Sequence, residues 1–327
     1  MRRRWFIAGL VVLLAVLASA TVRRRRPFPD DPRDDARAAE LQRKARVILI
    51  TLDGPVREDV FSLARLPKLH EAVGRGGVLL PAQATSPFAL SLPGYQALAA
   101  GRDTGCRDND CPRIGVETMG ERVARRLSLT AEQVAVFASW SRQRRAASSR
   151  DGLITVDAPE DQQPADPGPP WRNARWDKET FAKARAFWEQ HHPRFLHLAF
   201  LDTDELAHAD LREEYEVALH QADARISEVL SWVSALPEDE RRVTTVLITA
   251  DHGRGQSRWT EHGFFDRGSG DIFIAAIGEQ VRRDVRVEDA EQKDVRPTVE
   301  RLFGLCPDRV DDEGRALEAV VGGLPCR

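Results

Sequence analysis

Residues 243–253 read VTTVLITADHG, an apolar stretch rich in β-branched residues that ends in an Asp-His pair. A run of this kind, bounded by polar residues, predicts a buried β-strand. Asp251 and His252 follow the run directly, and His262 lies a short distance downstream. Carboxylate and imidazole groups at the end of a strand are candidate metal ligands.

Two upstream segments repeat this arrangement. The run Val47–Leu52 is followed by Asp53, and the run Phe195–Leu201 is followed by Asp204 and His208. In an open α/β sheet, ligands gather beyond the carboxyl ends of the strands, so the three clusters can converge on one crevice. Their mixed oxygen and nitrogen donors suit zinc first and manganese second. The sequence therefore predicts two divalent metal ions.

A candidate nucleophile lies in residues 85–95, TSPFALSLPGY. Ser91 precedes Pro93 and the helix-prone stretch Tyr95–Ala100, which places it near a helix N-terminus. Free N–H groups and the helix dipole favour an anion there. The alternative is that Ser91 only caps the helix, which is the commoner role of such a serine. Ser86 also precedes a proline, but Phe88–Leu90 separate it from the helix.

The order of these motifs from Arg46 to Gly278 resembles the alkaline phosphatase superfamily, in particular its smaller phosphodiesterase-like members. The shared pattern is strand-Asp-Gly, then Ser-x-Pro opening a helix that ends near Gly101-Arg102, then Asp-x-x-x-His, Asp-His-Gly and a final His. The resemblance implies two sets of metal ligands. One set is Asp53, Ser91, Asp251 and His252, and the other is Asp204, His208 and His262.

The resemblance also implies a three-layer α/β/α sandwich with a mostly parallel central sheet. The implied activity is hydrolysis of a small phosphate monoester or diester through a phosphoseryl intermediate. The alternatives are a sulfatase or phosphonate hydrolase of the same superfamily, or a non-catalytic metal-binding relative. Sulfatases carry Cys or Ser in C/S-x-P-x-R, and Tyr95 stands at the last position here, which disfavours that activity. All seven ligand positions are present, which disfavours a non-catalytic relative.

Strand-like and helix-like stretches alternate between the motifs, which independently predicts a mostly parallel sheet with helices on both faces. Strand candidates besides the three above are residues 78–81, 134–138, 153–156 and 272–277. Helix candidates are residues 63–73, 95–100, 119–127, 177–190 and 211–235. The proline-rich stretch Ala158–Trp171 cannot form a helix or a central strand, so we expect a surface loop or part of a substrate lid.

The N-terminus predicts export. Arg2–Arg4 precede the apolar run Trp5–Val22, so residues 1–22 are either a signal peptide or a membrane anchor. Residues 23–44 are expected to be a charged tether with little fold, and residues 45–327 a metal-dependent hydrolase domain. In both cases this domain lies in the periplasm or another extracytoplasmic space.

The four cysteines agree with an oxidising compartment. Local pairing predicts the disulfides Cys106–Cys111 and Cys306–Cys326, and a Cys₄ zinc site would need closer pairs than the second one. The net charge of −3 comes from 48 basic and 51 acidic residues spread along the chain. This balance argues against nucleic acid as a structural partner.

Three further polar residues need an interpretation. His197 lies within an apolar strand, which indicates a hydrogen-bonded core histidine. Asp202 competes with Asp204 for the ligand role, but only Asp204 has the four-residue spacing to His208. Asp223 is expected on a solvated helix face.

Overall fold

The computed structural model describes residues 32–160, 173–306 and 314–327. Within these residues an eight-stranded sheet has the order β4-β3-β5-β1-β6-β7-β2-β8. The pairs β6–β7 and β7–β2 are antiparallel, and the other neighbouring pairs are parallel. The strands are β1 (Arg46–Leu52), β2 (Gly77–Gln83), β3 (Val134–Ala138), β4 (Thr155–Asp157), β5 (Phe195–Phe200), β6 (Thr244–Ala250), β7 (Asp271–Ile277) and β8 (Ala290–Glu291).

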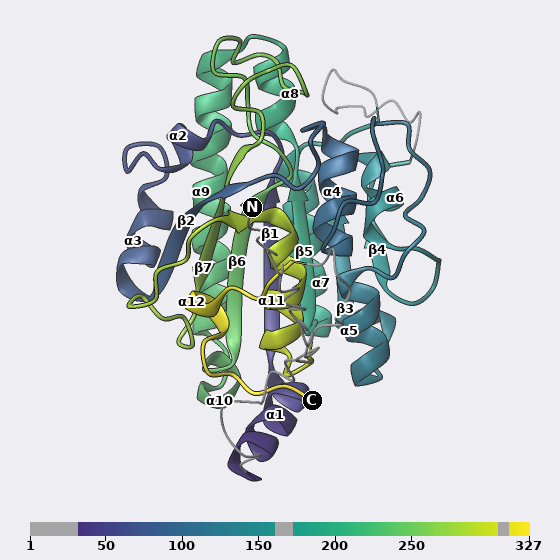
Figure 1. Cartoon of the computed structure of the whole chain (residues 1–327), viewed down its shortest axis with the longest axis vertical. Coiled ribbons are helices and arrows are strands. Elements are labelled where there is room, and N and C mark those ends of the chain that lie inside the picture. Colours follow the sequence, from purple (N-terminus) through teal and green to yellow (C-terminus); the bar gives the residue numbers. More distant parts are fainter. Residues whose placement is uncertain (1–31, 161–172, 307–313) are drawn as a thin grey trace, which may run out of the picture. The chain divides into compact units, whose positions relative to one another are not determined.

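Helices cover both faces of this sheet (Figure 1). The helices are α1 (Pro32–Lys44), α2 (Arg57–Val60), α3 (Pro67–Gly76), α4 (Ser91–Ala100), α5 (Met119–Leu127), α6 (Arg144–Ala147), α7 (Asp177–His191), α8 (Asp202–His208), α9 (Arg212–Ser234), α10 (Glu238–Arg241), α11 (Val295–Leu302) and α12 (Glu318–Val321). Short 3₁₀ turns are η1 (Ala131–Gln133), η2 (Ser141–Gln143) and η3 (Gln292–Asp294). The predicted three-layer α/β/α architecture with a mostly parallel sheet is confirmed.

Strand β5 packs against a helix on each of its two faces. Side chains alternate between the faces of a strand, so residues five positions apart point to opposite sides. Phe195 lies beside Gly120 of α5 on one face, and the ring of Phe200 lies 6.3 Å from that of Phe181 of α7 on the other. Both faces are therefore apolar, and every residue of β5 is buried.

The segment before β1 differs from the prediction. Residues 32–44 form α1, and Ala38 and Leu41 on this helix are buried in the core. The expectation of little fold over residues 23–44 is therefore wrong for residues 32–44. Ala38 and Leu41 share one face of the helix and are buried, and Arg194 also donates hydrogen bonds to the backbone oxygens at its end.

Asp223 also differs from the prediction. It is buried on α9, and its carboxylate accepts hydrogen bonds from the backbone N–H groups of Lys68 and Leu69 at 3.0 and 2.8 Å. These are unpaired donors in the first turn of α3, so Asp223 caps a neighbouring helix. These hydrogen bonds join residues far apart in sequence. The local sequence around Asp223 therefore predicted a solvated helix face instead.

Both predicted disulfides are present, with Cα–Cα distances of 5.7 Å for Cys106–Cys111 and 4.9 Å for Cys306–Cys326. The N-terminal segment 1–22 and most of the proline-rich stretch lie outside the described residues. Among the residues that the structure describes, no helix has the length and apolar character needed to cross a membrane.

Candidate active site

Three neighbouring parallel strands bring the predicted clusters to one edge of the sheet. Strand β1 lies between β5 and β6, and Leu52 pairs with Phe200 on one side and Ala250 on the other. The chain therefore leaves all three strands at the same level. Asp53 and Asp251 follow β1 and β6 directly, and α8 begins after β5. The convergence expected from the strand ends is observed.

Asp53, Asp251 and His252 form a first group of ligand atoms, all within 4.8 Å of one another and fully buried. His252 Nε2 lies 3.4 Å from Asp53 Oδ1 and 3.4 Å from Asp251 Oδ2. Among the described residues, the buried Oδ2 atoms of Asp53 and Asp251 have no hydrogen-bond partner. Buried carboxylate oxygens without partners are costly unless a cation neutralises them, so this group fits a metal ion.

Asp204, His208 and His262 form a second group. The Nε2 atoms of the two histidines lie 3.0 Å apart, and each faces the Asp204 carboxylate, at 3.3 Å for His208 and 3.6 Å for His262. His262 Nδ1 lies 2.8 Å from the carbonyl oxygen of Ala89, which accepts its proton. This bond leaves the Nε2 lone pair available to a cation, as metal-binding imidazoles require.

Gly54 lies between the two groups, and no larger residue fits there. Its φ is +50°, and an added Cβ would lie 2.4 Å from Asp204 Oδ1 and 2.8 Å from His252 Cε1. The glycine of the Asp-Gly motif is therefore required both by its backbone conformation and by the close approach of the two groups.

Ser91 is the first residue of α4, and its side chain faces the first group. Its Oγ lies 3.4 Å from Asp53 Oδ1 and 3.2 Å from His252 Nε2. The residue at the cap position is Leu90, so the interpretation of Ser91 as the helix cap does not hold. The backbone of α4 also lies close to the first group at Gly94, where an added Cβ would lie 2.4 Å from Asp251 O. The structure therefore places the predicted nucleophile beside the predicted ligands.

The electrostatics of the groups follow from burial. Burial and the charge of Asp204 raise the pKa of Asp53 to about 7, and burial and Asp53 raise that of Asp251 well above its usual range. Burial lowers the pKa of His252 and of His262 to about 4. These two imidazoles are therefore held neutral, the form that binds metals, whereas the Asp204 carboxylate raises the pKa of His208. The crowded carboxylates would ionise fully only beside added positive charge.

The structure decides two questions that the sequence raised, the choice between Asp202 and Asp204 as a ligand and the role of His197. Asp202 accepts a hydrogen bond from the backbone N–H of Asp177 at 3.2 Å and belongs to neither ligand group, whereas Asp204 belongs to the second. His197 is buried and lies 3.0 Å from Thr51 Oγ1, which confirms a core histidine. Burial lowers its pKa to about 3.

The sequence interpretation missed Arg254. Its guanidinium is buried, pairs with the Asp204 carboxylate, and donates to the carbonyl oxygens of Asp204 and Gly54 at 2.8 and 2.9 Å. It thereby links the second group to the loop after β1. The only local signal is its place directly after Asp-His-Gly, which by itself does not predict burial.

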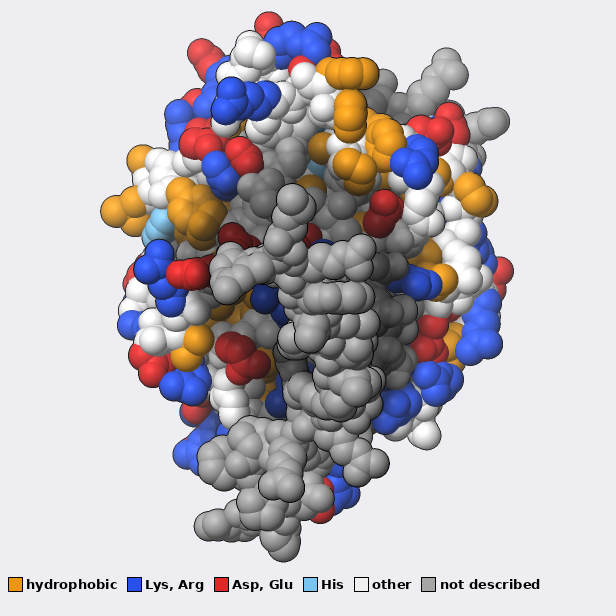
Figure 2. Space-filling view, in the orientation of Figure 1, with side chains coloured by type: hydrophobic (Ala, Val, Ile, Leu, Met, Phe, Trp, Pro, Cys, Tyr) orange, Lys and Arg blue, Asp and Glu red, His pale blue; other side chains and the backbone are white. Residues whose placement is uncertain are grey.

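Two exposed aromatic side chains lie close in sequence to His262 of the second group. Phe264 and Phe265 follow His262 closely and are 61% and 91% exposed. The ring centroids of Phe264 and Phe88 lie 5.9 Å apart. The Arg107 guanidinium lies 5.0 Å from the centroid of the Phe88 ring. Figure 2 shows hydrophobic side chains gathered at the upper end of the visible face. We call Phe88, Phe264 and Phe265 the aromatic rim.

Comparisons with known proteins give a partial family match and a shared fold. A family model described as the metalloenzyme superfamily matches residues 171–306, which include the second group, Asp251 and His252. This match supports the resemblance to the alkaline phosphatase superfamily that the sequence motifs indicate. No curated protein matches its sequence. A metalloenzyme family model implies divalent metal binding, and the solved structures of similar fold include hydrolases.

Solved structures share the fold at low identity. A putative sulfatase from Bacteroides thetaiotaomicron has a TM-score of 0.64 and 17% identity, with 85% of this chain and 75% of that chain covered. A phosphonate monoester hydrolase of Agrobacterium radiobacter has a TM-score of 0.57 and 16% identity, covering 86% and 78%. An alkaline phosphatase superfamily protein from Vibrio parahaemolyticus has a TM-score of 0.56 and 13% identity, covering 88% and 78%. These likenesses show the fold and carry no substrate to this chain.

Proposed function

We propose that this protein is an exported hydrolase of phosphate esters with Ser91 as its nucleophile. One observation carries the proposal: the Ser91 hydroxyl lies at the start of α4 within 3.4 Å of both Asp53 and His252. The first group would hold one divalent ion and the second group the other, with zinc the first candidate and manganese the second. Bound there, the ions would lower the pKa of the Ser91 hydroxyl and neutralise charge in the transition state.

The residues of the chain then perform a double displacement. Ser91 Oγ loses its proton and attacks phosphorus, the bond from phosphorus to the ester oxygen breaks, and the alcohol leaves with a proton. Water next attacks the phosphoserine, and the phosphorus–Oγ bond breaks to release phosphate and restore Ser91. The position of Ser91 at the N-terminal end of α4 favours the anion through the helix dipole.

Sulfate ester hydrolysis is the second candidate, because sulfatases are among the proteins of similar fold. Tyr95 argues against it. This residue stands one helical turn after Ser91, where the sulfatase motif has arginine, and it is buried. Burial and the carboxylates of Asp53 and Asp251 raise the pKa of Tyr95, so a neutral phenol takes the place of a cation.

The aromatic rim supports an ester whose alcohol carries an aryl or other apolar group. Such a group can pack on Phe264 and Phe265 while the phosphoryl group reaches Ser91. Phe265→Ala is expected to lower kcat/KM for nitrophenyl phosphate more than for methyl phosphate. Leu63→Ala, which removes a 65% exposed side chain from another segment, is the matched control. Equal losses on both substrates would contradict this assignment.

Export follows from the basic and apolar N-terminal segment and agrees with the two disulfides. A fusion of the whole chain to a reporter that is active only outside the cytoplasm should be active. The same fusion to a reporter that needs the cytoplasm should be silent, and the reverse pattern would reject export.

The decisive experiment compares four substrates on the purified protein with its metals counted. We expect nitrophenyl phosphate or the bis-nitrophenyl ester to be cleaved faster than the phenylphosphonate ester and nitrophenyl sulfate, with about two ions per chain. Ser91→Ala serves as the background for each substrate. Faster cleavage of the sulfate would replace the proposal with a sulfatase.

A further inference from the structure

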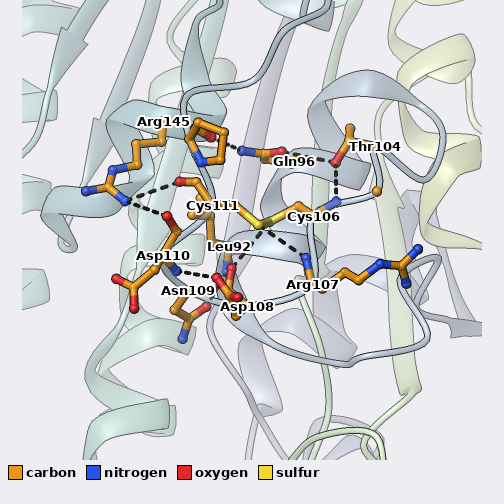
Figure 3. Close-up of a disulfide and its surroundings, with 12 residues drawn as sticks. Leu92, Gln96, Thr104, Cys106, Arg107, Asp108, Asn109, Asp110, Cys111 and Arg145 are labelled. Atoms are coloured by element: carbon orange, nitrogen blue, oxygen red, sulfur yellow. Dashed lines mark hydrogen bonds between the residues drawn. A yellow bond between two sulfur atoms is a disulfide. The ribbon is translucent and has the colours of Figure 1, made fainter.

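A disulfide-closed loop returns to the first turn of α4. Cys106 and Cys111 are joined, and Asn109 lies between them. The side-chain oxygen Oδ1 of Asn109 accepts a hydrogen bond of 2.9 Å from the backbone N–H of Leu92, the residue after Ser91 (Figure 3). A residue distant along the chain therefore contacts the backbone directly beside the proposed nucleophile.

This contact takes the place of an ordinary helix cap. The first N–H groups of a helix have no partner within the helix, and a side-chain oxygen at the cap position usually accepts one of them. Here the cap residue is Leu90, which makes no side-chain hydrogen bond, and Pro93 has no N–H. Asn109 supplies the missing acceptor, so it fixes the direction in which α4 begins and hence the position of Ser91.

The disulfide and two arginines hold Asn109 in place. Arg142 donates to the backbone oxygen of Asn109 at 2.6 Å and pairs with Asp110 at 2.9 Å. Arg145 donates to the backbone oxygen of Cys111 at 3.2 Å. These contacts reach the loop from the segment that includes η2 and α6.

The disulfide is the apolar anchor of this loop. Cys106 is buried in a small cluster with Leu92 and Tyr95, against which Cys111 also packs. Arg107, Asp108 and Asp110 are exposed. Residues 101–118 contain no helix or strand, so cross-strand or helical hydrogen bonds do not hold the loop together. Reduction of the Cys106–Cys111 disulfide would therefore release Asn109, and no single polar contact of the loop would be enough to hold it in place.

We propose that Asn109 is a positioning residue for Ser91 and that the Cys106–Cys111 disulfide sets its position, so that turnover depends on this cysteine pair being oxidised. The inference rests on the proposed role of Ser91. A dithiol reductant would supply two electrons and two protons, convert the disulfide into two thiols, and itself become a disulfide.

The first test compares the two disulfides of the same chain. The double variant Cys106→Ser/Cys111→Ser is expected to lower kcat on nitrophenyl phosphate by about tenfold or more, with a smaller change in KM. The matched control, Cys306→Ser/Cys326→Ser, removes the disulfide that lies elsewhere in the fold and should keep kcat within about twofold. Equal losses in the two double variants would overturn the proposal, and so would no loss in the first.

The second test keeps both disulfides and therefore does not depend on how the cysteine variants fold. Asn109→Ala removes the acceptor and should lower kcat by about tenfold, whereas Asn109→Asp keeps an oxygen for Leu92 N–H and should retain most of kcat. The added charge should raise KM for an anionic substrate. Metal content should stay unchanged in both variants. A loss of kcat as large in Asn109→Asp as in Asn109→Ala would overturn the role of this bond.

The variant Ser91→Ala distinguishes failure of the proposed function from failure of the inference about Asn109. If it keeps near-normal turnover, the proposed function fails together with this inference. If it is inactive while Asn109→Ala and the Cys106 and Cys111 variants keep full kcat, only this inference fails.

Discussion

At the scale of single residues, position separates Ser91 from the other hydroxyl side chains of its segment. Ser86 is also buried, but its Oγ accepts a hydrogen bond from the backbone N–H of Phe88. We expect Ser91→Ala to lower turnover by about three orders of magnitude or more and Ser86→Ala to be mild. Steady-state kinetics on nitrophenyl phosphate, with circular dichroism as the fold control, measure both. Near-normal turnover of Ser91→Ala would reject a covalent mechanism.

Two histidines provide a test of the metal assignment. His252 belongs to the first group and His262 to the second. Replacing each by alanine is expected to remove about one of two bound ions, and a different one in each case. Metal analysis of the two single variants and of the double variant checks this, because the double variant should lose both ions. Loss of both ions in either single variant would mean that the groups form one indivisible site.

Asp202 predicts a dependence of stability on pH. Burial, followed by the charge of Asp177, raises the pKa of Asp202 to about 8. The folded protein therefore keeps a proton that the unfolded chain releases above about pH 4, and the associated stability is lost as pH rises through about 8.

Asp202→Asn removes this titration. The unfolding free energy of the variant, relative to the unmodified protein, should increase between about pH 5 and about pH 9 by at least about 1 kcal/mol. Urea unfolding of both proteins, each stripped of metal, measures the difference. If the two proteins differed in unfolding free energy by the same amount at both pH values, the raised pKa of Asp202 would be contradicted.

At the scale of elements, the turn after β1 has to pass between the two ligand groups. Gly54→Ala would place a Cβ against Asp204 and His252 and is strained at a φ of +50°. It should weaken metal binding and activity by an order of magnitude or more. Gly74→Ala within α3 meets no neighbouring atom within 4 Å, so it should stabilise the protein by about 0.5–1 kcal/mol and keep activity. If both variants behave alike, the close approach at Gly54 is unimportant.

At the scale of the whole molecule, metal binding should support both activity and stability. Within the described parts of the chain, two buried carboxylate oxygens of the first group have no hydrogen-bond partner, so removal of a cation would leave them uncompensated. A chelator is therefore expected to abolish turnover and lower the melting temperature, and zinc or manganese should restore both. Calorimetry before and after chelation checks this. A chelated protein that stays active and melts unchanged would exclude a metal enzyme.

Local sequence patterns determined the strands, the superfamily resemblance and the candidate residues of the site. The apolar runs before Asp53 and Asp251 read as strands because their hydrophobicity is continuous over a short length. The Ser-x-Pro before a helix-prone stretch placed Ser91 at a helix start. Each of these signals is contained in a few consecutive residues.

Only the tertiary structure decided how distant segments meet. The register of β1 with β5 and β6 sets the strand ends at one level. Arg254 reaches Asp204, and Asn109 reaches Leu92, across intervals of sequence that carry no periodic signal. Helix α1 likewise became ordered through contacts that its own charged composition does not predict. The physical reason is the same throughout: the free energy of these contacts comes from burial and pairing between segments, which no local pattern encodes.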